Sequence, residues 1–366
     1  MDRLDEVSLK LQRVRGWLNS SGLEAVLVTS QANFAWLTGG GNNYVSTGNI
    51  AGEASLLVTS DGSYLLSNNI ESRRLLEEEV AGLPFEPLTW YWYEGDGAKE
   101  HLGRLCDPSK SVSDIRFLDL PLASEGFSAL RYDMLPPEVD RYRRLGQEAA
   151  QAVEKVCREA SSGDVELDVA ASLAFECQKL GILPLVNLVA ADERIARYRH
   201  PLPTKNPIQR TLMVVLSGRR QGLHISLTRL ISFGPLDPDL LARHRAVTKV
   251  DARFILESRA GNTLGAVVSR AVEQYAIEGF PQEWRLHHQG GLTGYADREI
   301  LGTGDAGHWL RHHQVLAWNP SITGTKSEDT VLVTETGPQV LTRTGDWPEL
   351  EVELPGGSIG RPSIKT

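Results

Sequence analysis

Cysteine is scarce in this sequence, and the three cysteines present lie far apart. Cys106, Cys157 and Cys177 have none of the paired spacing of zinc or redox motifs, and an odd number argues against a disulfide framework. We therefore expect three buried thiols in a protein that works in a reducing compartment.

Long apolar runs are also missing. No run approaches the roughly 18 residues that a membrane span requires, and the opening MDRLDEVSLK has no apolar core of a secretory signal. We expect a cytoplasmic protein with no membrane partner.

The sequence also has no excess of positive charge. The chain has 38 basic and 47 acidic residues, and the resulting net charge of -9 provides no electrostatic footprint for nucleic acid. A small-molecule substrate is the predicted partner, and a nucleic acid is not expected.

The length of 366 residues favours two domains. In the first third, apolar residues recur at helical spacing over residues 4–18, strands are predicted at 24–30 and on both sides of an Asp-Gly turn within 54–67, and helical spacing returns at 70–81. Proline interrupts this pattern at 136 and 137. We predict an α/β domain over residues 1–135.

The second predicted domain, residues 136–366, combines helices with β-rich segments. Helical patterns cover 139–156, 166–180, 236–257 and 262–279, and β-branched runs separated by turns cover 184–191, 211–218, 222–234, 314–322 and 329–335. We predict an α+β domain in which the helices group against an antiparallel sheet.

Polar residues with catalytic potential gather in four segments at strand ends or in glycine-rich turns. These segments are RYRHPLPT, GLHISLTR, HHQGGLTGYADRE and NPSITGTKSEDT. Side chains placed in this way converge if their strands belong to one curved sheet. A histidine with nearby carboxylates suits proton transfer, because imidazole titrates near neutral pH. The same residues also have ordinary structural roles as caps, ion pairs or backbone contacts.

The order of these segments resembles the pita-bread fold of the superfamily of Xaa-Pro peptidases, aminopeptidase P and creatinase. The matching string runs HPLPT, VVLSG, GLHISLTR, HHQGGLTG, DRE, AWNPSITG and KSEDTVLVTE, and residues 3–39 resemble the opening of prolidase-type members. The resemblance covers nearly the whole chain. It implies a creatinase/prolidase-type N-terminal domain, a pita-bread C-terminal domain and a homodimer.

Metal-dependent members of this superfamily hold two divalent ions with two Asp, one His and two Glu. By the resemblance, only Glu328 retains a ligand; the other four positions fall at Val215 (or Leu216), Ser226, Gly291 and Asn319. Such side chains cannot supply the negative charge that holds two dications together. The resemblance therefore predicts no metal and no other cofactor, and Gly291 is expected to leave room for substrate.

The predicted function is hydrolysis of a C–N bond in a small nitrogen-rich substrate without metal. Creatinase and ectoine hydrolase are members that lack the metal set, and in creatinase the histidine matching His200 is the acid and base. We predict His200, Glu299 and Glu328 as catalytic residues. Predicted substrate contacts are Arg298, His288, His224, Tyr295, Asn319 and Lys326.

Two alternatives remain at this point. A pita-bread domain without catalysis would serve as a binding module, and a Xaa-Pro dipeptidase or aminopeptidase is disfavoured by the missing ligands. Creatine itself is not the expected substrate, because Thr228 stands where creatinase has an acid before its Arg.

Overall fold

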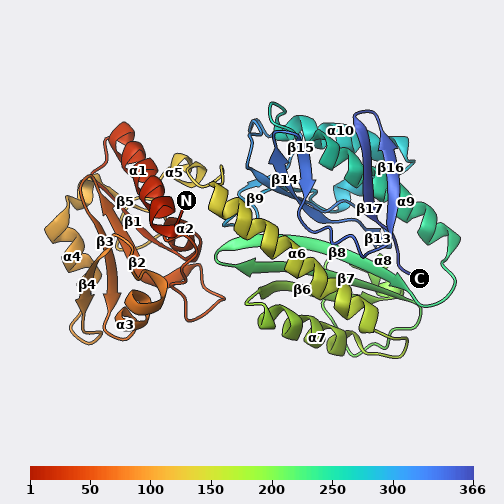
Figure 1. Cartoon of the computed structure of the whole chain (residues 1–366), viewed down its shortest axis with the longest axis horizontal. Helices are drawn as coiled ribbons and strands as arrows, with labels where there is room; N and C mark the ends of the chain where they lie inside the picture. The colour runs from red at the N-terminus through yellow and green to blue at the C-terminus, as the bar shows by residue number, and fades with distance from the viewer. The chain divides into compact units, whose positions relative to one another are not determined.

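The computed structural model describes all residues, 1–366, and divides them into two compact units (Figure 1). The first comprises Met1–Glu138 with Gln221–Leu223, and the second comprises Val139–Arg220 with His224–Thr366. Helix α6 (Pro136–Glu159) begins at the proline pair, where the missing amide hydrogen of proline costs nothing because the first turn of a helix has no acceptor for it.

The first unit is built on a mixed five-stranded sheet in the order β4-β3-β2-β1-β5. Strand β1 pairs antiparallel with β2 and parallel with β5, and β3 pairs parallel with β4. The bounds are β1 Ala25–Ser30, β2 Ala51–Thr59, β3 Ser63–Asn68, β4 Glu86–Trp90 and β5 Ser111–Ser113. Helices α2 (Gln31–Leu37), α4 (Gly97–Leu105) and α5 (Glu125–Ala129) complete the unit.

Helix α1 (Arg3–Ser21) confirms the helical pattern of residues 4–18. The Asp2 carboxylate caps its start by accepting the Asp5 backbone N–H, and Gly22 ends it in the left-handed conformation, with φ of 67°. Its buried apolar face consists of Val7, Leu11, Val14 and Leu18.

The helix predicted over residues 70–81 takes a different form. Helix α3 (Ser72–Arg74) passes into a π-helical turn, η1 (Leu75–Glu79), which ends where the Val80 N–H donates to the Leu75 carbonyl. The wider turn occurs where the Glu79 carboxylate accepts hydrogen bonds from Arg74 and from the backbone N–H of Asn42. The contact with Asn42, 37 positions away, is not visible in a helical periodicity.

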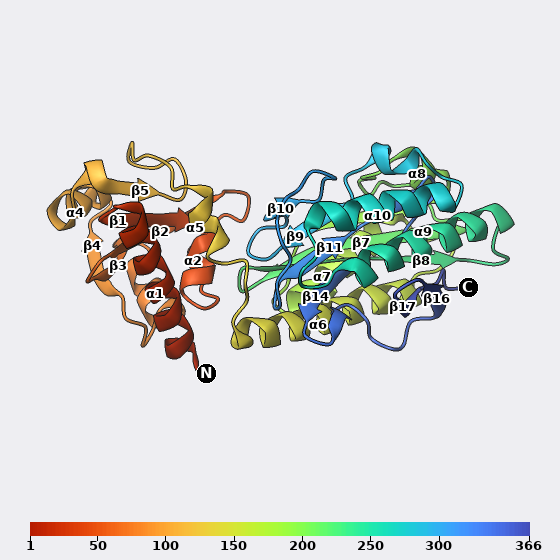
Figure 2. The same ribbon diagram turned by 90° about the horizontal axis from the view of Figure 1, so that it is seen from above.

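The second unit has the predicted antiparallel sheets with helices grouped on them (Figure 2). One sheet has the order β6-β7-β8 and the other β10-β9-β11-β14-β15. Their bounds are β6 Leu183–Ala191, β7 Thr211–Arg220, β8 Leu223–Ser232, β9 Gly290–Thr293, β10 Ile300–Leu301, β11 Val315–Trp318, β14 Asp329–Thr334 and β15 Gly337–Val340. Helix α7 (Glu166–Lys179) packs on β6, and α9 (Pro238–Glu257) packs on α10 (Leu264–Ile277).

Short elements complete this unit. They are α8 Glu193–Arg197, η3 Glu283–Leu286, β12 Ser321–Ile322, β13 Thr325–Lys326, β16 Glu349–Leu354 and β17 Gly357–Pro362. None of the helices in the chain combines the length and the apolar character that a bilayer crossing demands.

The main core of the second unit lies where α9 and α10 meet β11 and β14. The rings of Phe254 and Trp318 stack with centroids 4.4 Å apart, and the Trp318 indole N–H donates to the Ser258 hydroxyl at 2.8 Å. The largest aromatic side chain of this core thus has its single polar atom satisfied.

A buried charge cluster joins four elements beside this core. The Asp329 carboxylate accepts hydrogen bonds from Arg229 at 3.1 Å, from the Thr342 hydroxyl at 2.5 Å and from Arg361, which also donates to Asp251. None of these residues is more than 2% exposed. Because buried charges are tolerated only when paired, this cluster fixes the mutual positions of β8, β14, β17 and α9.

Replacing Arg361 with Met is expected to lower the free energy of unfolding by about 3–5 kcal/mol, because Asp251 and Asp329 would remain buried without their shared partner. Chemical denaturation measures the loss. The matched control is Arg104→Met, since that arginine forms an exposed i,i+4 pair with Glu100, worth at most about 1 kcal/mol. Equal losses in the two variants would contradict the role assigned to the cluster.

Candidate functional site

Three histidines from two separate loops meet in the second unit. His200 follows α8, whereas His287 and His288 lie between η3 and β9. The Nε2 atoms of His200 and His287 are 2.8 Å apart, and the rings of His287 and His288 stack with centroids 4.4 Å apart. One ring nitrogen from each histidine lies within 4.8 Å of the other two. We call these three residues the histidine cluster.

The backbone on each side of the histidine cluster is held by buried and partly buried hydrogen bonds. Arg199, next to His200, donates to Glu283 at 2.6 Å and to the Ser321 hydroxyl at 3.0 Å. The Gln289 amide donates to the His287 carbonyl at 2.6 Å, and its oxygen accepts the Tyr275 hydroxyl at 2.9 Å. The two loops are therefore positioned by their neighbours.

The histidines of the cluster favour their neutral forms. Burial, followed by the positive charge of Lys326, lowers the pKa of His287 to about 3. Burial, followed by Arg298, lowers the pKa of His288 to about 4. Burial and then Lys326 also lower the pKa of His200, while Glu328 acts in the opposite direction. At neutral pH the cluster offers uncharged imidazoles with free lone pairs.

Glu328 supplies a carboxylate near these rings. It lies between β13 and β14 and is 3% exposed. Its Oε2 accepts the Thr228 hydroxyl at 2.5 Å and lies 2.9 Å from Nζ of Lys326, whereas Oε1 has no hydrogen bond within the chain. The carboxylate is thus held firmly by one oxygen and leaves the other available.

Arg298 is a largely buried guanidinium without an acidic partner. Burial lowers the pKa of this arginine, and the negative charge of Glu328 opposes that effect. Its Nη1 donates to the Asp297 carbonyl, and its buried Nε has no hydrogen bond. A buried unpaired donor of this kind is costly unless a ligand satisfies it.

The structure therefore brings together five of the predicted residues, namely His200, His288, Arg298, Lys326 and Glu328. The other four predicted residues are Glu299, His224, Tyr295 and Asn319. Oε1 of Glu299 accepts the backbone N–H groups of Tyr295 and Ala296 at 3.1 Å, which closes the turn between β9 and β10.

The remaining predicted contacts are buried in strands or at their ends. The His224 ring Nδ1 lies 3.3 Å from the Gly294 carbonyl oxygen, and the Tyr295 side chain is 1% exposed. Asn319 is buried, and its Oδ1 has no hydrogen-bond partner. The role of these three residues as substrate contacts remains a prediction.

His287 is the member of the cluster that the sequence prediction omitted from the candidate site. The pair His287-His288, close to Gly290-Gly291, could have indicated both histidines. The prediction included only His288. The hydrogen-bond partner of His287 in the cluster, His200, lies 87 positions earlier in the chain. A contact over such a separation follows from the fold and not from local spacing.

The expectation that Gly291 leaves room for substrate is wrong. A Cβ at this position would lie 2.2 Å from the Ile300 carbonyl oxygen and 2.7 Å from the Gly302 nitrogen, because the backbone of β10 fills the space. Nearby, Val215 packs in an apolar cluster with Leu188 and Met213.

The Ser226 hydroxyl bonds to that of Ser217 at 3.3 Å. No charged side chain is therefore present at three of the positions that the resemblance matches to metal ligands, Val215, Ser226 and Gly291.

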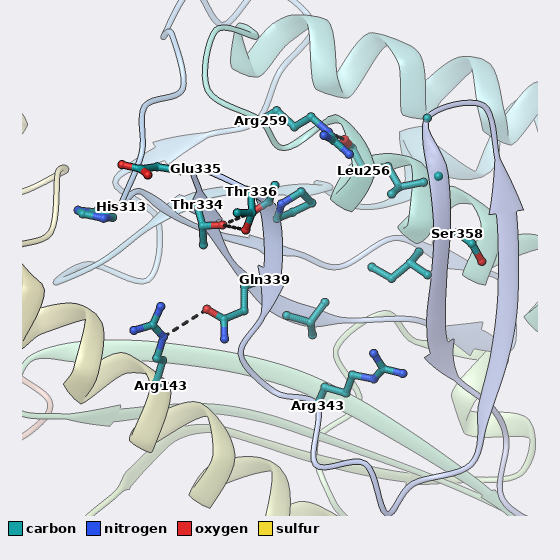
Figure 3. A pocket seen from close by; sticks show the side chains of 16 residues that line it. Arg143, Leu256, Arg259, His313, Thr334, Glu335, Thr336, Gln339, Arg343 and Ser358 are labelled. Carbon is teal, nitrogen blue, oxygen red and sulfur yellow. Dashed lines mark hydrogen bonds between the residues drawn. The ribbon is translucent and has the colours of Figure 1, made fainter.

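A separate cavity of about 800 Å³ lies in the second unit and shares no residue with the histidine cluster (Figure 3). It is lined by the β14–β15 and β16–β17 hairpins together with Arg143, Arg259 and Arg343. Arg143 donates to Gln339, and Arg343 pairs with Glu349. Arg259 donates to the Leu256 carbonyl at 2.9 Å, so all three arginines are already engaged by neighbours.

Comparison with known families decides the classification. The model of metallopeptidase family M24 matches residues 140–335, more than half of the chain. The chain belongs to metallopeptidase family M24. A second model, the creatinase/prolidase N-terminal domain, matches residues 10–114 of the M24 chain. Both parts of the predicted family assignment are confirmed.

Solved structures share the fold of this M24 protein along nearly their whole length. A prolidase from Pyrococcus horikoshii OT3 has a TM-score of 0.79 at 18% identity, with 92% of this chain and 98% of that chain covered. A Xaa-Pro dipeptidase from Bacillus anthracis has a TM-score of 0.77 at 18% identity, with the same coverage.

The N-terminal domain of the FACT complex subunit SPT16 from Cicer arietinum is also similar, with a TM-score of 0.70 at 13% identity, covering 93% of this chain and 97% of that chain. At these identities the likeness concerns the fold alone. A search of curated proteins found no match.

Replacing Gly291 with Ala is expected to destabilise this M24 protein by about 1–3 kcal/mol or more, because the added Cβ meets the backbone of β10. Thermal unfolding measures the shift. Gly307→Ala is the matched control, since a Cβ there meets nothing within 4 Å. Unchanged stability of the Gly291 variant would show that the space beside Gly291 is open after all.

Proposed function

We propose that this M24 protein hydrolyses a C–N bond in a small nitrogen-rich substrate, such as a guanidino, ureido, lactam or amide compound, without the pair of metal ions of its metal-dependent relatives. The observation that carries the proposal is the group of neutral imidazoles with one available carboxylate, in a chain that has the uncharged residues Val215, Ser226 and Gly291 at positions that the family resemblance matches to metal ligands. Two dications require several anionic donors, and Glu328 is a single one.

His200 is the proposed acid and base. As a neutral imidazole it removes a proton from the attacking water and returns it to the departing nitrogen, so that the proton count balances over the reaction. Its Nε2 lies 2.8 Å from Nε2 of His287, which orients the His200 ring. Oε1 of Glu328 is positioned to orient the water or to bind a cationic nitrogen of the substrate.

Arg298 is the proposed anchor for a substrate carboxylate. Its Nε lacks a partner, and no carboxylate of the chain pairs with its guanidinium. Arginine binds carboxylates through two parallel hydrogen bonds, which would both fix the substrate and satisfy the unpaired donor. Glu299, which closes the neighbouring turn, would act by holding this segment in place.

The structural likeness to prolidases and Xaa-Pro dipeptidases favours a dipeptide substrate as the second candidate. Both candidates are hydrolyses of a C–N bond. They differ in whether activity requires added metal.

Screening the four compound classes and Xaa-Pro dipeptides with chelator-treated protein tests the proposal. We expect turnover of a C–N compound, and a fall in kcat of about 10²–10⁴-fold in His200→Ala, because the variant lacks the proton-transfer group. His312→Ala is the control, since that exposed histidine lies outside the cluster.

Two results would contradict the proposal. Activity confined to Xaa-Pro dipeptides and dependent on added metal would assign the protein to the second candidate. No turnover of any class would favour a binding module.

The pH profile tests the role of His200 separately. A general base must be deprotonated, so kcat/KM is expected to rise with pH through the pKa of His200, with the midpoint of the rise below the ordinary histidine value of about 6.5. Lys326→Met removes a positive charge that lowers this pKa, and the rising limb is expected to move to higher pH. Lys99→Met, an exposed change in the other unit, is the control. A limb that stays in place in Lys326→Met would exclude His200 as the titrating base.

A further inference from the structure

We propose that His200, His287 and His288 form a site for one divalent transition-metal ion, held by three imidazole nitrogens with water in the fourth position. The inference goes beyond the proposed hydrolase function, and it uses none of the carboxylates that bind the metal pair in metal-dependent relatives. Three histidines and one open position form a known type of zinc site.

The distances within the histidine cluster are close to those of such a site. Zn–N bonds are about 2.0–2.1 Å long, so two ligating nitrogens are separated by about 3.3 Å in tetrahedral geometry and by at most about 4.2 Å. To reach the tetrahedral separation, the His200–His287 pair, at 2.8 Å, has to open by about 0.5 Å, and the other separations, which are within 4.8 Å, have to close by at most about 1.5 Å. The rings of His200 and His288 are only partly buried, which leaves them room to make this adjustment.

The His200–His287 contact already brings two potential ligand atoms, the two Nε2 nitrogens, within 2.8 Å of each other. A hydrogen bond between two neutral imidazoles uses one N–H and one lone pair, and a metal ion would replace this bond when the donating ring shifts its proton from Nε2 to Nδ1. His288 stacks on His287 and brings the third ring alongside.

The surrounding charges determine which ions fit. Lys326 and Arg298 lie near the rings and oppose a cation, whereas Glu328 favours one and already pairs with Lys326. With so little net negative charge, ions that depend on carboxylate oxygens, such as Mg²⁺ and Mn²⁺, are disfavoured. The ions expected to bind are those with a strong preference for imidazole, such as Zn²⁺ and Co²⁺.

Coordination would engage the lone pair of His200 and withdraw it from proton transfer. A loaded site and the proposed hydrolysis therefore exclude each other. Metal binding is measured without any assay of activity. A failure of the metal-site proposal can therefore be distinguished from a failure of the proposed hydrolysis.

Titration of tag-free, chelator-treated full-length protein with Co²⁺ tests the site, because the visible absorption of Co²⁺ reports its coordination geometry. We expect one Co²⁺ per chain with the intense absorption of a four-coordinate ion, and loss of that absorption when Zn²⁺ displaces it. His287→Ala and His288→Ala are expected to weaken Co²⁺ binding at least about tenfold. His312→Ala is the control and should bind as the wild type does.

Circular dichroism of each variant verifies that it is folded, and His288→Ala, a change at an exposed side chain, provides the answer if His287→Ala does not fold. The proposal is overturned if no 1:1 complex forms, if the absorption is the weak one of a six-coordinate ion, or if the folded cluster variants bind Co²⁺ as tightly as the wild type.

Discussion

The buried charge cluster around Asp329 is the constraint on which the rest of the second unit depends. Arg229 from β8 and Arg361 from β17 meet on this one carboxylate at the start of β14. Glu328 is the preceding residue, and successive side chains of an extended chain point to opposite sides. Fixing Asp329 in the core therefore directs the Glu328 carboxylate toward Thr228 and Lys326. Of these two neighbouring acids, Asp329 thus stabilises the fold and Glu328 belongs to the candidate site.

The chemistry that we propose follows from the uncharged residues that stand at positions matched to anionic metal ligands. Around Val215, Ser226 and Gly291 the chain has apolar packing, a hydroxyl pair and a backbone contact. Close to the available oxygen of Glu328 it has neutral imidazoles and the positive charges of Lys326 and Arg298. Such a site favours an anionic group on the substrate and proton transfer by imidazole over the binding of two dications.

Periodicity and turn chemistry predicted most of the elements of the fold. The helices of residues 4–18 and 166–180 and the antiparallel strands of the second unit correspond to α1, α7 and β6–β8. The order of seven short segments predicted the family, because their spacing is a property of the whole chain. The form of one predicted helix depended on contacts that periodicity does not show. The helix over 70–81 becomes a π-helical turn where Glu79 reaches Arg74 and Asn42.

The candidate site shows the same limit. His200, His288 and Glu328 could be selected from residue type and position, but the contact of His287 with His200 requires two loops to meet. The space beside Gly291 was predicted from the absence of a side chain, and β10 occupies it with backbone atoms. A sequence shows which side chain is missing and does not show what replaces its volume.

Electron paramagnetic resonance of protein dialysed against Mn²⁺ tests the central claim most directly, namely that the site works without a pair of bridged metal ions. Mn²⁺ prefers the oxygen ligands of the carboxylate centre, and two neighbouring Mn²⁺ ions give a spin-coupled spectrum. The account predicts no spin-coupled signal and no binding of two ions per chain. A spin-coupled pair at a stoichiometry of two Mn²⁺ per chain would contradict it.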